Sequence, residues 1–285
     1  MKKLLSLLFI LSFIVSGCSN KNSYQTHAIE DETVLITNYK NKPETGRPRN
    51  QTLLDNIFIA LNELKTSSNY QSVSKGNVVA KKGSLSLATQ EISNRKIVTP
   101  NATFSESISV STFVKVAEQL YLAPTQVLKR NAKKVSNSSS ISWDSNVTKL
   151  DYQQYLKQYG YSSKDPSRYV INENTIISDI EVVNDGKGRK YTYKFNLDPI
   201  IAPYFYKSTV KYLSDSSKDP VFETIEMTMT FDYKWRMTQI TVDEIYEIEI
   251  PALGKVTCYA TLTETFKNVN RNTNIQEESF FKKFL

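Results

Sequence analysis

The sequence has few of the residues that carry most hydrolytic and metal chemistry. It contains one histidine, His27, two cysteines, Cys18 and Cys258, and eight glycines among 285 residues. With no histidine beyond residue 27, a nucleophile–histidine pair and a histidine-rich zinc site are both excluded from the folded part of the chain. The glycines form no GxGxxG or GxxxxGK run, so the loops that cradle phosphates are also missing. We therefore expect a protein that is not an enzyme and needs no cofactor or metal.

The charge of the chain is moderately positive. Lysine and arginine number 36 against 29 acidic residues, and the densest basic cluster is Lys129, Arg130, Lys133 and Lys134. This cluster fits either a contact with anionic lipid headgroups or wall polymers, or a solvated turn between strands. No recognised nucleic-acid-binding motif accompanies the charge, so we expect no nucleic-acid partner.

The N-terminus reads as an export signal. Lys2 and Lys3 precede an apolar run over residues 4–15, which is followed by Val15-Ser16-Gly17-Cys18. The run is shorter than the ~20 residues that span a bilayer, which favours a cleaved signal over a transmembrane anchor. A plain secretory signal is the other alternative.

Residues Val15 to Cys18 resemble the lipobox of bacterial lipoproteins. The resemblance implies cleavage before Cys18, a diacylglyceryl group on its thiol, and attachment to the membrane by acyl chains such as palmitate. The protein would then lie on the extracytoplasmic face of the cell membrane, and its low cystine content suits a Gram-positive cell. Because a lipidated Cys18 leaves Cys258 alone, no intrachain disulfide is expected.

Composition divides the chain into four parts. Residues 1–17 are the predicted signal peptide, and residues 18–50, with Pro43, Gly46 and Pro48, form a predicted flexible tether. Residues 51–270 form one predicted α+β domain, in which two sub-halves could meet near 140–150. Residues 271–285 are a predicted polar C-terminal tail.

Hydrophobic periodicity predicts the elements of this domain. A helix begins at Thr52, short helices cover 151–159 and about 199–213, and residues 131–142 read as a loop. Period-two alternation predicts strands, including a hairpin around Asp185-Gly186 and three long strands that close the domain. In the strand near Phe104 the serines on the opposite parity are expected to face water. The predicted fold class is α+β: a large twisted antiparallel sheet, which could curve into a half-open barrel, with helices packed on one face.

A few residues stand out as candidate ligand contacts. Glu244 and Glu264 share the apolar parity of their strands, where a carboxylate is costly unless paired. They fit the sheet rim, a polar spot in a ligand cavity, or an acid–base pair of glycosidase type. The aromatic residues Tyr204, Phe205 and Tyr212 fit either a lid over an apolar pocket or plain helix-on-sheet packing. Cys258, on the inward parity, is expected to be a small core residue.

The predicted order of elements behind the lipobox is similar in architecture to the LolA and LppX/LprG group of lipoproteins. That resemblance covers about residues 52–268 and implies a half-open barrel that carries or senses a hydrophobic ligand. We therefore expect a membrane-anchored, non-enzymatic lipoprotein that binds an apolar or amphipathic ligand between sheet and helices. The alternative is an envelope interaction module that binds a protein or wall polymer through its Ser/Thr-rich sheet faces.

Overall fold

The computed structural model describes Ile57, Ala60, Leu61 and Leu64 and most of residues 67–285. Within that range the exceptions are 68, 112–114, 160–168, 170, 172–174, 185, 187, 205–206, 208–209, 212–215, 217, 235 and 251–252. The predicted signal peptide and tether, with Cys18 and His27, lie outside the described residues.

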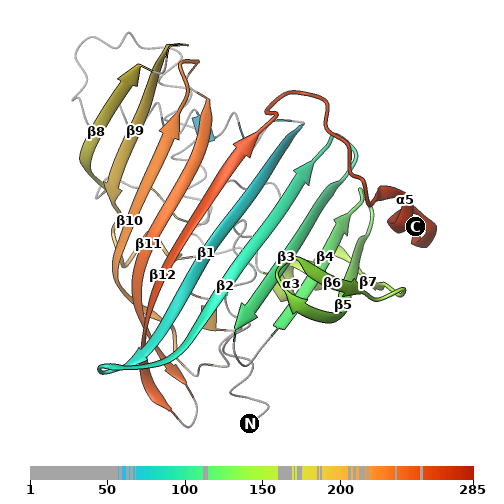
Figure 1. Ribbon diagram of the computed structural model, residues 1–285, viewed down its shortest axis with the longest axis horizontal. Coiled ribbons are helices and arrows are strands. Elements are labelled where there is room, and N and C mark those ends of the chain that lie inside the picture. Colours follow the sequence, from blue (N-terminus) through green and yellow to red (C-terminus); the bar gives the residue numbers. More distant parts are fainter. Residues whose placement is uncertain are drawn as a thin grey trace.

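The described chain is dominated by one antiparallel sheet of 12 strands (Figure 1). Its strands are β1 (Tyr70–Lys82), β2 (Leu85–Val98), β3 (Thr103–Ser111), β4 (Lys115–Leu122), β5 (Val127–Asn137), β6 (Ser140–Trp143), β7 (Thr148–Leu150), β8 (Ile176–Asn184), β9 (Arg189–Asn196), β10 (Val221–Phe231), β11 (Met237–Ile250) and β12 (Gly254–Lys267). Two meanders, β1–β6 and β8–β12, join where β1 pairs with β12, which gives the order β6-β5-β4-β3-β2-β1-β12-β11-β10-β9-β8. β7 pairs with β5 off this path.

The two faces of the sheet are buried in different ways. We call the face that carries Val78, Val242 and Leu262 the inner face, because these side chains belong to the largest buried apolar cluster. That cluster also contains the buried positions Ile57 and Leu61, which are helical as the pattern after Thr52 predicts. The opposite, outer face is largely polar over β10–β12.

The predicted α+β class is wrong. Of the residues that the structure describes, 62% lie in strands and 10% in helices, and the sheet is open and curled. The helices whose bounds are described are short: α3 (Tyr152–Tyr159) and α5 (Glu278–Phe281), the latter followed by the 3₁₀ turn η2 (Lys282–Phe284).

These short helices also do not share one face. Tyr155 of α3 packs with Leu120 and Val127 beside the inner face. Phe281 of α5 packs with Phe104 and Tyr121 on the opposite side. In Figure 1 α5 lies at the edge of the β2–β5 half, where the C-terminal segment ends.

The prediction of an α+β class underestimated the share of strand, because the polar residues 131–142, which were interpreted as a loop, extend β5 and form β6. Edge strands are often polar, since charged side chains protect an open sheet edge.

The C-terminal segment is part of the fold. Thr273 Oγ1 donates to the carbonyl of Val98, at 3.1 Å, and Ile275 is buried. Phe281 is fully buried and stacks on Tyr121 with ring centroids 5.3 Å apart. Residues 271–285, described above as a polar tail, therefore cover part of the outer face.

The serines of β3 were predicted to face water, but the structure places them on the inner face of the sheet. Ser109 and Ser111 are buried on the inner face, whereas Phe104 points outward and is covered by the C-terminal segment. The alternation correctly separates two faces, but it does not say which of them is the interior.

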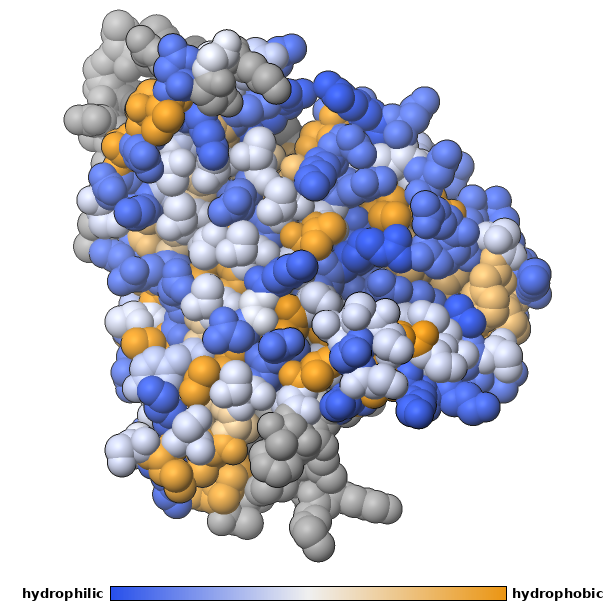
Figure 2. Space-filling model, in the orientation of Figure 1, coloured by the Kyte–Doolittle hydropathy of each residue, from blue (hydrophilic) through white to orange (hydrophobic). Residues whose placement is uncertain are grey.

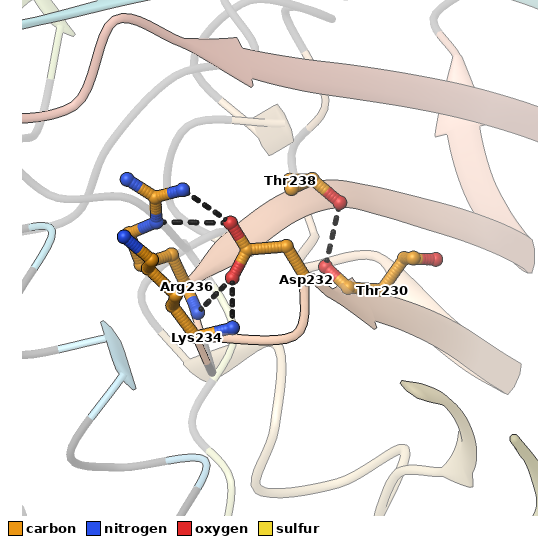
Figure 3. Close-up of polar contacts among 5 residues, drawn as sticks. All are labelled: Thr230, Asp232, Lys234, Arg236 and Thr238. Carbon is orange, nitrogen blue, oxygen red and sulfur yellow. Dashed lines mark hydrogen bonds and ion pairs between the residues drawn. The ribbon is translucent and has the colours of Figure 1, made fainter. Parts of the chain in front are cut away.

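The β10–β11 hairpin shows how a turn is fixed locally (Figure 3). Asp232 Oδ2 accepts bonds from Nε and Nη2 of Arg236, at 2.9 and 2.6 Å. Its Oδ1 accepts from the backbone N–H groups of Lys234 and Arg236. Burial alone would raise the pKa of Asp232, but these bonds and the nearby guanidinium outweigh it and hold that pKa below its ordinary value.

In the part of the chain that the structure describes, no helix is long and apolar enough to cross a bilayer.

Candidate functional site

A line of polar side chains crosses the inner face. Ser74 on β1 stands in register with Glu264 on β12 and Asn94 on β2. Asn94 is in register with Ser107 on β3, which in turn faces Glu118 on β4. Neighbouring strands lie about 4.8 Å apart, so these five residues, which we call the polar row, extend about 19 Å across the sheet.

Four of the five residues of the polar row are buried, and Ser107 is half-buried. Ser74 is 1% exposed, Asn94 5%, Glu264 7% and Glu118 8%. Asn94 Nδ2 donates to Ser74 Oγ at 3.3 Å, and Lys129 Nζ on β5 lies 2.6 Å from Glu118 Oε2. The row is therefore a hydrogen-bonded and partly ion-paired strip in a place where a sheet normally carries apolar side chains.

Further polar side chains flank the row on the same face. Towards one end of the strands lies Lys96, 2% exposed, with its ammonium 5.2 Å from the centre of the Tyr70 ring. Towards the other end Gln90 Nε2 donates to Ser109 Oγ, and both residues are buried. The inner face of β1–β4 thus offers hydroxyl, amide, carboxylate and ammonium groups close together.

The register line of the polar row continues into β11 and β10, where its residues are apolar. Glu264 is in register with Ile240 on β11, and Ile240 is in register with Met229 on β10. Both are buried in the main apolar cluster. Along this line the inner face therefore changes from polar to apolar at β12. On β1 and β2 the polar row is flanked by Val78 and Ile92, which belong to the same apolar cluster. We call the inner face over β10 and β11 the apolar half.

Glu244, predicted as a ligand contact, lies in the apolar half. It is 3% exposed, and the hydroxyl of Tyr169 donates a hydrogen bond to its Oε2 atom. Glu264 pairs in register with Ile240, four residues before Glu244 on β11. Four residues correspond to about 13 Å along a strand, more than the roughly 5–10 Å that separates the carboxyl groups of glycosidases. The register therefore does not bring the two carboxylates together as an acid–base pair.

The other predicted residues are placed only in part. Tyr204 is helical and half-buried, and its backbone N–H donates to the carbonyl of Ile201 at 3.0 Å. Phe205, Tyr212 and Cys18 lie outside the described residues. Cys258 is buried, as expected of a core residue, and burial raises the pKa of its thiol to about 12, with Glu244 adding to the rise and a hydrogen bond with Tyr246 opposing it.

In the described part of the chain, no three histidine, cysteine or acidic side chains gather as a possible metal site.

Most of the polar row was not predicted from the sequence. The available signal was parity, because Ser72 and Ser74 share the parity of Val78 and Ala80, and Asn94 shares that of Ile92. Following the alternation through the whole of β1 and β2 would have placed these polar residues on the inner face. Their alignment across five strands depends on strand register, which the sequence does not state.

No family model and no curated protein matches the sequence. Among solved structures, a LolA superfamily protein from Nitrosomonas europaea matches at 12% identity, over 80% of this chain and 98% of that chain, with a TM-score of 0.25. A complex of MucA and MucB from Pseudomonas aeruginosa matches at 5% identity, over 72% of this chain and 92% of that chain, with a TM-score of 0.11. At such TM-scores neither likeness bears on the function of this chain. A functional proposal must therefore rest on the chemistry of the inner face.

Proposed function

We propose that this protein is a membrane-anchored, extracytoplasmic binding protein for an amphipathic ligand, and that it is not an enzyme. The polar group of the ligand contacts the polar row, and its apolar part lies against the side chains around Ile240 and Met229. The observation that carries this proposal is that the polar row and the apolar cluster around Ile240 and Met229 share one inner face.

The cost of burying polar groups supports a binding role. A buried polar group that loses its partner costs about 1–3 kcal/mol, so an inner sheet face built only for stability is normally apolar. Here the polar row is kept beside an apolar cluster, and such departures from the ordinary pattern are expected at functional sites.

The alternative interaction module draws on the outer face, where Thr228, Thr241 and Thr263 stand in register. The hydroxyls of Thr241 and Thr263 lie 3.0 Å apart and bond to each other. The outer face is largely polar over β10–β12, whereas the inner face brings polar groups and a large apolar cluster together, as an amphipathic ligand requires. We therefore favour the inner face.

Ligand binding is tested with a fluorescent C16 fatty acid as the probe. Asn94→Leu replaces an amide of the polar row by an apolar group of similar size, and we expect it to weaken probe binding at least tenfold. The matched control is Asn77→Leu on β1, because Asn77 is exposed on the outer face, and its affinity should equal that of the parent. Equal affinities of all three proteins, with native circular dichroism in each, would contradict the inner face as the site.

The anchor is a separate part of the proposal and rests on the sequence Val15-Ser16-Gly17-Cys18. Expression of the parent with labelled palmitate should give a labelled, membrane-bound protein, and Cys18→Ala should give an unlabelled one. Membrane retention of the Cys18→Ala protein at the parent's mature mass would exclude lipidation at this position.

A further inference from the structure

Two long hairpins end side by side at one end of the sheet, at the lower left of Figure 1. Lys81 at the end of β1 is in register with Thr257 near the start of β12. Beyond them, Lys82 Nζ donates to the carbonyl of Leu253 at 2.6 Å, which ties the β1–β2 tip to the β11–β12 tip. The two tips therefore form one surface and not two independent loops.

This surface exposes apolar side chains next to lysines. We call Val79, Lys81, Lys82, Leu85 and Tyr259 the tip surface. Val79, Lys81 and Tyr259 share the outer face, and Lys82 and Leu85 pair at the end of the hairpin with the opposite parity, so the tip surface wraps around the hairpin end. Leu85 is 64% exposed and Tyr259 40% exposed, and Val79 is in register with Tyr259. Lys81 Nζ lies 4.7 Å from the centre of the Tyr259 ring. Apolar side chains lie among polar ones at this end of the molecule in Figure 2.

The electrostatics of the tip surface are positive. Neither Lys81 nor Lys82 forms an ion pair with a carboxylate of the described residues. Two carboxylates of β11, the strand beyond β12, are already paired: Glu247 with Lys255 at 2.6 Å and Glu249 with Lys218 at 2.7 Å. The two lysines of the β1–β2 tip therefore present charge that an anionic partner can neutralise.

We propose that the tip surface docks on a bilayer that contains anionic lipid. An aliphatic side chain at a hairpin tip can enter the boundary between headgroups and acyl chains, and tyrosine favours the headgroup level. Lysines near an anionic leaflet strengthen binding by about fivefold each. This contact would orient the sheet relative to the membrane, and it does not depend on whether the inner face binds a ligand.

The test uses the chain from residue 18 onward with Cys18→Ala, which carries no lipid and keeps every described residue. Its sedimentation with vesicles of phosphatidylcholine containing 30% phosphatidylglycerol is compared with that on pure phosphatidylcholine vesicles. We expect binding to the anionic vesicles and at least tenfold weaker binding to the neutral ones. Equal binding to both, or no binding to the anionic vesicles, would overturn the proposal.

Variants locate the contact. Lys81→Gln with Lys82→Gln should weaken binding to anionic vesicles at least tenfold, and Leu85→Ser should weaken it at least threefold. The matched control is Lys133→Gln with Lys134→Gln, which removes the same charge from the exposed end of β5 and should change binding less than twofold. A larger loss in the control pair than in the tip pair would overturn the assignment. Asn94→Leu in the same background should bind vesicles like the parent, which separates this surface from the inner-face site.

Discussion

The hydroxyl of Tyr169 donates a hydrogen bond to the Oε2 atom of Glu244, joining two residues that lie 75 positions apart in the chain. Both side chains are buried, at 7% and 3% exposure. A buried carboxylate needs such donors, because its charged form is poorly solvated inside the protein. The bond therefore ties Tyr169, which comes between α3 and β8 in the chain, to the apolar half of the inner face.

Tyr169→Phe removes this donor and keeps the ring. We expect the free energy of unfolding to fall by about 1–3 kcal/mol, because a buried polar group that loses its hydrogen-bond partner costs about that much. Urea unfolding at pH 7 measures the difference. Tyr233→Phe is the control. Because Tyr233 is 48% exposed, the loss of its hydroxyl should leave the free energy of unfolding almost unchanged. Identical urea midpoints for the parent and Tyr169→Phe would show that the bond contributes nothing.

Gly76 is required by the close approach of two strands. A Cβ atom at this position would lie 2.2 Å from the carbonyl oxygen of Thr261 on β12. We expect Gly76→Ala to cost about 3 kcal/mol, because the backbone of β12 must move. At Gly254, with φ of +73°, an added Cβ meets nothing within 4 Å, so Gly254→Ala should cost only the backbone strain of about 1–2 kcal/mol. Thermal and urea unfolding would contradict this reasoning if Gly254→Ala were the more damaging change.

The strands were the most predictable part of the fold. β11 and β12 each keep a period of two over more than ten residues, so both strands follow from local sequence. Gly186, with φ of +80°, lies between β8 and β9, where the hairpin was predicted. The helix over 151–159 is likewise confirmed by α3.

Long-range features were not predictable. The outer position of Phe104 depends on a C-terminal segment that packs over it from the far end of the chain. The polar row exists only because five strands pair in one register, which places Ser74, Asn94 and Glu118 in line. Neither relationship leaves a signal within a window of ten or fifteen residues.

The C-terminal segment should contribute strongly to stability. Phe281 is fully buried between Tyr121 and Phe104, so Phe281→Ala should lower the free energy of unfolding by about 3–5 kcal/mol. Phe284 is only partly buried, so Phe284→Ala should lower the free energy of unfolding by about 1 kcal/mol. Guanidinium unfolding of both variants tests whether Phe281→Ala is the more destabilising. If Phe281→Ala unfolded at the same guanidinium concentration as the parent, the C-terminal segment would pack on the sheet without stabilising it.

We expect the stabilising effect of the Asp232–Arg236 contact on the β10–β11 hairpin to depend on pH. The pKa of Asp232 is lower in the folded than in the unfolded chain, so its stabilising effect is complete above about pH 4. The effect is lost as the pH falls through the lowered pKa. Asp232→Asn should therefore cost about 1 kcal/mol at pH 7 and progressively less towards pH 2, as measured by urea unfolding across that range. A cost that stays constant with pH would contradict an ionic origin.

The central claim is that the inner face holds an amphipathic ligand, and native mass spectrometry of protein gently extracted from membranes tests it most directly. Denaturing spectra of the same sample give the covalent mass, including any lipid on Cys18, so that extra mass in the native spectrum belongs to a non-covalent ligand. We predict one bound amphiphile per chain in the parent and in Asn77→Leu, and a marked loss of it in Asn94→Leu. A native mass equal to the covalent mass in every preparation of the parent would contradict the claim.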